Sequence, residues 1–143
     1  MLSKRKHKTK KQYKVEDIKH HPFAKFIDGD KLNLSQQELS DTDIPEVMCL
    51  LELYPKVKKI DLSLNNIGDA GIVNFVEKNQ TIVEANFCGN TISDRGVISF
   101  AFKNQFVKHV DFSHNLISMQ GINHFAKENN ACISTKFSTI QIH

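Results

Sequence analysis

The sequence predicts an α/β solenoid, a stack of similar units that each contribute one strand and one helix. The clearest sign is an internal repeat of 25 residues, because the pattern of residues 57–67 recurs at 82–92 and again at 107–117. Within each unit, the spacing of apolar residues changes from a period of two to a helical period. Repeats at one fixed period bury their apolar faces against their neighbours, so we expect the units to share one continuous core.

Each unit is expected to begin with a strand and to end with a helix. Ile60 and Leu62 alternate with polar residues, which is typical of a half-buried strand, while Ile72, Phe75 and Val76 have the i, i+3, i+4 spacing of a short helix. Six of the ten phenylalanines fall in two repeat columns, which indicates core packing and not an aromatic binding face. These columns comprise Phe75, Phe100 and Phe125, and Phe87, Phe112 and Phe137.

Polar residues also recur in columns. An asparagine at the ninth position of each unit can satisfy backbone groups where the chain leaves the strand. This column comprises Asn65, Asn90 and Asn115. Asp69 and Asp94 precede the helical stripe, so we expect them to cap the N-termini of their helices. A third column, expected to end the helices in the left-handed conformation, comprises Asn79, Asn104 and Asn129.

These three units resemble leucine-rich repeats, whose pattern is L-x-x-L-x-L-x-x-N-x-L within 20 to 29 residues. The continuation at residues 65–71, echoed at 90–96, is similar to the helix-containing, ribonuclease-inhibitor-like branch of that family. The resemblance implies a right-handed solenoid with parallel strands on the concave face and helices on the convex face. It also implies a weaker first unit at residues 32–39, offset by 28 residues, whose three extra residues we place in its helix near 44–54.

We divide the chain into three parts. Residues 1–14 lack a hydrophobic pattern and are expected to be a disordered basic tail. Residues 15–28 are expected to form an N-terminal cap of two short turns over the first strand, because Pro22 breaks any long helix there. Residues 29–143 hold the leucine-rich repeats with a truncated C-terminal unit, in which Ile140 replaces the asparagine and an edge strand is left open to pairing.

The positive charge is concentrated in the tail. The formal charge is +3, but seven of the 19 basic residues occupy the first 14 positions, where there is no acid. The other 12 basic residues are outnumbered by 16 acidic ones, so residues 15–143 carry a net charge of −4 and do not indicate a nucleic-acid-binding fold. The tail could serve as a solubilising segment, a nuclear-import signal or a contact to an anionic membrane or nucleic acid. Its basic arm comprises Lys4, Arg5, Lys6, Lys8, Lys10 and Lys11.

The sequence favours an intracellular protein without a metal or cofactor. No apolar run reaches the length of a membrane helix, and no apolar stretch of a signal peptide follows the charged N-terminus. We therefore expect a cytoplasmic or nuclear location, or secretion into a host cell if the protein is a bacterial effector. Cys49, Cys88 and Cys132 are an odd number without metal-ligand spacing, so we expect reduced thiols.

Residues that point outward between the buried strand positions are the candidate binding surface, since leucine-rich repeats usually bind there. The candidate partner-binding residues are Lys59, Asp61, Ser63, Glu84, Asn86, Cys88, His109, Asp111, Ser113 and His114. At about 4.8 Å per strand, this face covers only about 200 Å², against about 800 Å² per partner in a standard interface. We therefore expect recognition to recruit the loops after the strands as well. These loops contain Leu64, Asn66, Gly89, Thr91, His114 and Leu116.

The same residues are weaker candidates for a catalytic site than for a binding surface. Asp61 and Asp111 lie two strands apart, about 10 Å, but an exposed sheet offers no cleft that excludes water. His109, Asp111 and Ser113 supply the residue types of a serine hydrolase, yet neighbours on one face of a strand are about 6 to 7 Å apart, too far for a nucleophile to bond its base. Cys88 faces outward, but its column neighbours are serines and not the cations that activate a thiol.

The predicted function is therefore a non-enzymatic adaptor or interaction module that binds another protein. Family members of this branch include enzyme inhibitors, GTPase regulators, actin-capping proteins and bacterial effectors, and the composition, rich in Lys, Asn and Ile, would suit an effector from an AT-rich genome. The alternative is a targeting or nucleic-acid-associated protein that its basic arm attaches to an anionic surface. Salt dependence separates the two, because binding through the arm would weaken steeply with salt.

Overall fold

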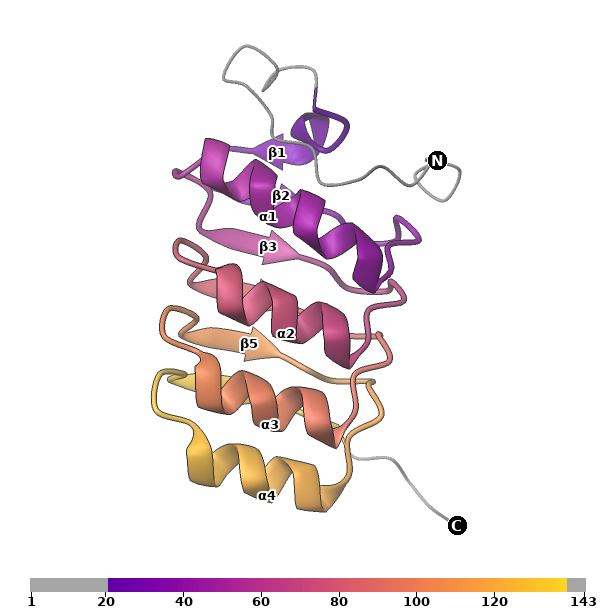
Figure 1. Ribbon diagram of the computed structural model, residues 1–143, viewed down its shortest axis with the longest axis vertical. Helices are drawn as coiled ribbons and strands as arrows, with labels where there is room; N and C mark the ends of the chain where they lie inside the picture. Colours follow the sequence, from indigo (N-terminus) through magenta and orange to yellow (C-terminus); the bar gives the residue numbers. More distant parts are fainter. Residues whose placement is uncertain (1–20, 139–143) are drawn as a thin grey trace.

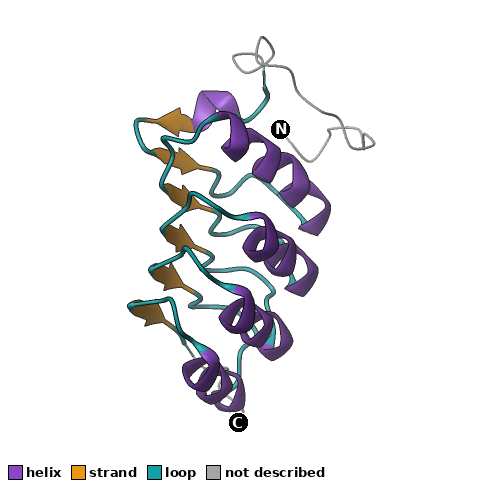
Figure 2. Cartoon of the chain, turned by 60° about the vertical axis from the view of Figure 1, so that its left-hand side comes forward, coloured by secondary structure: helices purple, strands orange, loops and turns teal. Residues whose placement is uncertain are grey.

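The computed structural model describes residues 21–138 of the 143-residue chain. Strands line one face of the molecule and helices the other, as Figures 1 and 2 show. The strands are β1 (Ile27–Asp28), β2 (Lys31–Asn33), β3 (Lys59–Asp61), β4 (Glu84–Asn86), β5 (His109–Asp111) and β6 (Ser134–Lys136). The α-helices are α1 (Ile44–Leu53), α2 (Asp69–Lys78), α3 (Asp94–Lys103) and α4 (Met119–Glu128), and two 3-10 turns, η3 (Ala24–Phe26) and η4 (Asp41–Asp43), precede β1 and α1.

The sheet confirms the predicted solenoid and its register. Strand order follows the sequence from β1 to β6, and β2 to β6 are parallel. Lys59 pairs with Glu84, Glu84 with His109, and His109 with Ser134, so each of the three steps from β3 to β6 is one 25-residue repeat. Because a slip of one residue would turn the apolar side chains outward, the buried columns hold this register.

The phenylalanine columns form the centre of the core. Phe87 stacks on Phe112 with ring centroids 5.7 Å apart, and Phe75 and Phe100 meet these rings edge-on at 5.2 Å. All four side chains are fully buried. Burial of one such ring contributes about 1.5 to 3 kcal/mol, so the columns predicted as core are the main apolar support of the stack.

The column of Asn65, Asn90 and Asn115 satisfies backbone groups where the chain leaves each strand, as predicted. The structure adds that these side chains form an asparagine ladder, in which each also bonds the unit before it. The side-chain oxygen Oδ1 of Asn90 accepts a hydrogen bond from the Ile67 amide at 2.9 Å. Its Nδ2 donates to the carbonyls of Leu62 and Phe87, each at 3.0 Å. Asn115 repeats this pattern one unit later on Ile92 and Phe87. The buried amides therefore satisfy backbone groups that the short strands leave unpaired.

The prediction that Asp69 and Asp94 cap their own helices is wrong. The N-cap residues of α2, α3 and α4 are Gly68, Ser93 and Ser118, one residue earlier. Asp69 Oδ1 instead accepts from the backbone amide of Ser93, in the next unit, at 2.7 Å, and its other oxygen accepts from the Ser93 hydroxyl. The partner lies 24 residues away, so the contact exists only once the units are stacked.

This contact explains why glycine recurs every 25 residues in a column that comprises Gly71, Gly96 and Gly121. Asp94 holds Ser118 in the same way that Asp69 holds Ser93. A Cβ added to Gly96 would collide with the Asp69 carboxylate, and one added to Gly121 would collide with that of Asp94. Glycine at these helix positions therefore leaves room for the aspartate of the preceding unit.

The helix ends also differ from the prediction. Asn79, Asn104 and Asn129 adopt extended backbone conformations, with ψ between 121° and 130°, and not the left-handed conformation. The Asn79 side chain instead bridges the following turn, accepting from the Ile82 amide at 2.8 Å and donating to the Ile82 carbonyl at 2.9 Å. Each asparagine therefore shapes the loop that leads into the next strand.

In the first unit, the three extra residues lie before the helix and not inside it. Helix α1 has ten residues, as do α2, α3 and α4. The additional residues form η4, where the Ser40 and Asp43 side chains make a reciprocal capping box. Asp41 in this turn accepts from the Gly68 amide, so the insertion still supplies the carboxylate that links this unit to the next.

At the N-terminal end, residues 21–28 cover the first unit. Phe23 is fully buried in the core, and β1 pairs with β2 as an antiparallel strand. Residues 1–20 lie outside the described part of the chain, including the predicted tail, its basic arm and the first part of the predicted cap. Ile140 lies outside it as well. Between residues 21 and 138, no helix has the length and apolar character needed to cross a membrane.

Candidate functional site

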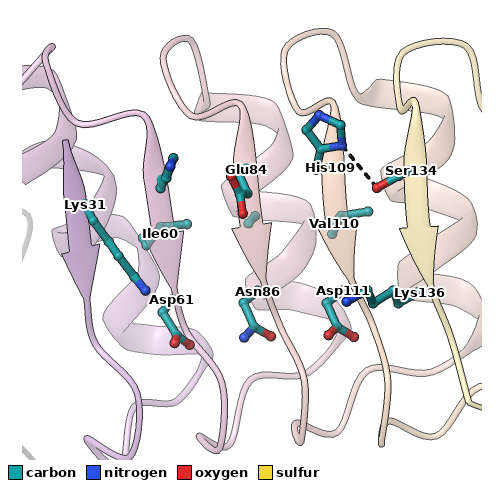
Figure 3. A pocket seen from close by; sticks show the side chains of 12 residues that line it. Lys31, Ile60, Asp61, Glu84, Asn86, His109, Val110, Asp111, Ser134 and Lys136 are labelled. Atoms are coloured by element: carbon teal, nitrogen blue, oxygen red, sulfur yellow. Dashed lines mark hydrogen bonds between the residues drawn. The ribbon is translucent and has the colours of Figure 1, made fainter.

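The strand face carries a hollow of about 490 Å³ that spans β2 to β6. Ile60, Ala85 and Val110 are part of its lining. Side chains alternate between the two faces of a strand, and the rest of the lining comes from the first residue of β2 and the first and third residues of β3 to β6. Figure 3 shows them as two rows that run across the sheet. The first row comprises Lys31, Lys59, Glu84, His109 and Ser134, and the second comprises Asp61, Asn86, Asp111 and Lys136.

In the second row, each carboxylate or amide closes the turn that follows its strand. Asp61 Oδ1 accepts from the Ser63 amide at 2.9 Å and from the Ser63 hydroxyl at 2.6 Å. Asp111 Oδ1 likewise accepts from the Ser113 amide at 2.8 Å. Oδ2 of both aspartates makes no hydrogen bond within residues 21–138, so one oxygen of each carboxylate faces the hollow without a protein donor.

The side chains of the first row are exposed to solvent. His109 Nδ1 lies 3.0 Å from the Ser134 hydroxyl across the neighbouring strand, as the dashed line in Figure 3 shows. Asp111 bonds the Ser113 backbone amide, so the histidine, aspartate and serine of the strand do not form a relay. Within the described part of the chain, no group of three or more His, Cys, Asp or Glu side chains is arranged to hold a metal ion.

Six of the ten candidate partner-binding residues line the hollow. The other four are placed beyond its rim, and Ser63 is buried because its hydroxyl bonds Asp61. These four are Ser63, Cys88, Ser113 and His114. Six further residues line the hollow that the candidate set did not contain: the polar Lys31, Ser134 and Lys136, and the apolar Ile60, Ala85 and Val110. The 25-residue period would have found Ser134, since it is one repeat beyond His109.

Two of the three thiols, those of Cys88 and Cys132, have a raised pKa. Burial is the main cause that raises the pKa of Cys88 above its ordinary value of 9.0, and the nearby carboxylates of Asp111 and Asp61 raise it further. Burial also raises the pKa of Cys132 to about 11. Thiolate is the nucleophilic form of cysteine, so both residues are poor nucleophiles at neutral pH.

Two exposed leucines lie on the loops after the strands. Leu64 and Leu116 are each 53% exposed. The backbone of Leu64 is left-handed, with φ of 57°, which is unfavourable for a leucine. Its side chain lies against Gly89, where an added Cβ would come within 2.7 Å of Leu64 Cδ2. Two of the loops that we expected to extend the binding surface therefore present exposed apolar side chains.

Comparison with known proteins supports the architecture. The family described as "Leucine Rich repeat" matches residues 55–76, which hold β3 and the first part of α2. Together with the repeat columns and the stacked strand–helix units, this match decides the family. The chain is a leucine-rich repeat protein. No curated protein matches it in a sequence comparison.

Solved structures that this leucine-rich repeat protein resembles share its fold at low sequence identity. The Mex67 LRR domain from Chaetomium thermophilum has a TM-score of 0.68 at 13% identity and covers 90% of this chain and 95% of its own. The structure of the Chaetomium Mex67:Mtr2 subunits has a TM-score of 0.66 at 12% identity, and the match covers 84% of this chain and 88% of that one. Leiomodin-1 Actin-Binding Site 2 has a TM-score of 0.63 at 15% identity, and the match covers 89% of this chain and 78% of that one.

The leucine-rich repeat fold is usually non-catalytic and generally serves as a protein-interaction module.

Proposed function

We propose that this leucine-rich repeat protein binds another protein through its strand-face hollow and the adjacent loops, without catalysing a reaction. The observation that carries the proposal is the contrast between the two faces of the sheet. The inward residues of β2 to β5 are buried, whereas the outward residues of β2 to β6 gather six charged side chains in one open hollow. These are Lys31, Lys59, Asp61, Glu84, Asp111 and Lys136.

The charge pattern favours a polar partner surface with charges of both signs. The two aspartates of the second row flank Asn86, and Lys136 stands at one end of that row. A partner would meet anionic groups at the centre and cations at the margins. Such patterns select partners mainly through complementary charge and raise the association rate at low salt.

The exposed leucines supply the apolar component. A polar hollow of this size is too small to hold a folded partner tightly, whereas interfaces gain most of their affinity from a few buried apolar anchors. Leu64 and Leu116 are exposed on the loops that follow β3 and β5, and we expect them to become such anchors on binding. The names of two similar structures agree with this kind of function, since one is an actin-binding site and another is a complex of two proteins.

Charge reversal in the first row tests the proposal. Lys59→Glu combined with Glu84→Lys changes two exposed side chains that make no hydrogen bond to the rest of residues 21–138. The matched control is Arg95→Glu combined with Lys127→Glu, on exposed positions of α3 and α4. In affinity capture at physiological salt, the first-row variant should lose proteins that the wild type and the helix-face control both retain. Equal retention by all three would refute binding through the hollow.

The second candidate function, attachment by the basic arm, is favoured by the concentration of seven basic residues in the first 14 positions. Deletion of residues 1–14 would then abolish binding to anionic vesicles or nucleic acid, and the affinity would fall steeply between 50 and 200 mM salt. The similar structures give no support to a role as a bacterial effector, so that role is not part of the proposal.

A further inference from the structure

Within residues 21–138, each unit of the solenoid is covered by the next one, and the unit of α4 and β6 has no such cover. Val76 in α2 and Ala101 in α3 are buried, whereas Ala126, in the same column of α4, is exposed. Val107 is likewise fully buried, whereas Cys132, one repeat later, is only partly so. We define the C-terminal end face by the apolar residues in this position. They are Met119, Ile122, Ala126, Cys132, Ile133 and Phe137.

The last helix also departs from the polar link that joins the other units. Asp41, Asp69 and Asp94 each hold the start of the following helix segment through their carboxylates. In α4 this column carries Met119, which is 60% exposed. A carboxylate at this place would have no backbone amide to bind, and the sequence instead provides an apolar side chain on the end face.

The edge strand β6 adds a backbone surface to the same face. Within residues 21–138, β6 pairs only with β5. The Lys108 carbonyl accepts hydrogen bonds from the amides of Ile133 and Ser134 on the next strand. Ile133 lies one repeat after Lys108, so its carbonyl is placed to accept a hydrogen bond from a further strand. Ile133 is 77% exposed, more than any other large apolar side chain in the described part of the chain. An open edge flanked by such a residue is a template for strand pairing.

We propose that a second copy of this chain covers the C-terminal end face, with its β6 running antiparallel to β6 of the first copy. Two-fold symmetry requires antiparallel pairing of identical strands. Centred on Thr135, this pairing sets Ser134 of each copy opposite Lys136 of the other, so no lysine faces a lysine. Ile133 of each copy then lies opposite Phe137 of the other, which joins two apolar residues.

The same symmetry brings together the two copies of α4, with Met119 and Ile122 at the contact. Head-to-tail stacking fits less well, because the other edge of the sheet is the two-residue strand β1, which is already antiparallel to its neighbour. It would also build open-ended filaments and not a closed pair.

The size of the end face sets the expected affinity. A ten-residue helix is about 15 Å long and packs about 10 Å from the sheet, so with its loops the face covers about 400 Å² per copy. A standard stable interface buries about 800 Å² per partner. The dimer should therefore be weak, with a dissociation constant of about 10 μM to 1 mM.

Sedimentation of the full chain over this concentration range tests the proposal. The wild type should convert from monomer to dimer, Ile133→Lys should remain monomeric, and Val83→Lys should behave as the wild type. Val83 is the matched control because it is exposed in the same repeat column of an inner unit. A wild-type monomer at every concentration would overturn the proposal, and so would assemblies larger than a dimer. If the wild type were monomeric at every concentration and Ile133→Lys lowered its stability, residues 139–143 of the same chain would be the better candidate to cover the end face.

A cysteine pair tests the register. A mixture of Ser134→Cys chains and Lys136→Cys chains should form a disulfide-linked mixed dimer under mild oxidation, because antiparallel partners lie about 4.5 to 5.5 Å apart. Peptide mapping distinguishes this bond from any that involves the native cysteines. Crosslinking of Ser134→Cys chains alone, to the same extent as the mixture, would contradict pairing about Thr135.

Discussion

Replacement of Asn90 by alanine is the sharpest perturbation of the fold. The side chain is buried, and it makes one hydrogen bond as acceptor and two at 3.0 Å as donor. Its removal leaves the buried Ile67 amide without its acceptor. The two carbonyls are affected less, because Leu62 still accepts from Asn65 and Phe87 still accepts from Asn115.

The magnitude follows from this inventory. An orphaned buried amide costs about 1 to 3 kcal/mol, and each of the two lost secondary bonds costs about 0.5 to 1 kcal/mol. We therefore expect Asn90→Ala to lower the free energy of unfolding by about 3 kcal/mol. Since domains are stable by only about 5 to 15 kcal/mol, this loss would be a large fraction of the total.

Urea unfolding followed by circular dichroism measures the effect. The matched control is Asn123→Ala on the exposed face of α4, where the change should be neutral or slightly stabilising because alanine is the better helix former. If Asn90→Ala cost no more than the control, the ladder would not be a main support of the stack.

Three further predictions concern the glycine column, the loops and the thiols. Gly96→Ala should destabilise the protein by about 1 to 3 kcal/mol despite the better helix propensity of alanine, and Asp69→Ala should relieve part of this loss in a double-mutant cycle measured by urea unfolding. Leu64→Asn should leave the unfolding midpoint unchanged or raised, because asparagine tolerates the left-handed backbone, yet it should reduce partner capture; lost stability or full capture would contradict the anchor role. The Cys132 thiol has its folded pKa raised from 9.0 to about 11, so the stability that its neutral form contributes is present below pH 9 and is lost as pH rises towards 11. The stability of wild type relative to Cys132→Ala should therefore fall between pH 9 and 11 in urea titrations, and a constant difference would contradict the raised pKa.

Much of the fold follows from periodicity, because a buried column must repeat with the stack. Ile60, Ala85 and Val110 occupy one column in the sequence and pair side by side in the sheet. The asparagine ladder was predictable for the same reason, since an amide at the end of every strand meets unpaired backbone groups in every unit.

The aspartates could not be assigned in this way. A helix-start aspartate in a sequence is most simply interpreted as a cap for its own helix, whereas Asp69 binds Ser93 in the next unit. Only the distance between stacked helices decides between these partners. The extended backbone of Asn79 has a similar origin, because its side chain is satisfied by Ile82 in the following loop.

The candidate site was predictable to the extent that strand alternation places side chains. Glu84, Asn86 and His109 face the hollow as their positions require. Ser63 does not, because Asp61 draws its hydroxyl into the turn after the strand. Beyond the third strand residue the alternation ends, and local hydrogen bonds decide where a side chain lies.

Photo-crosslinking tests the central claim, protein binding at the strand-face hollow, most directly. A photoreactive residue in place of Glu84 samples the hollow, and the same residue in place of Arg95 samples the helix face. The account predicts that, in the protein's native cells, the Glu84 site crosslinks to a discrete partner protein and that the Arg95 site does not. Crosslinks to that partner from Arg95 alone, with none from Glu84, would contradict it.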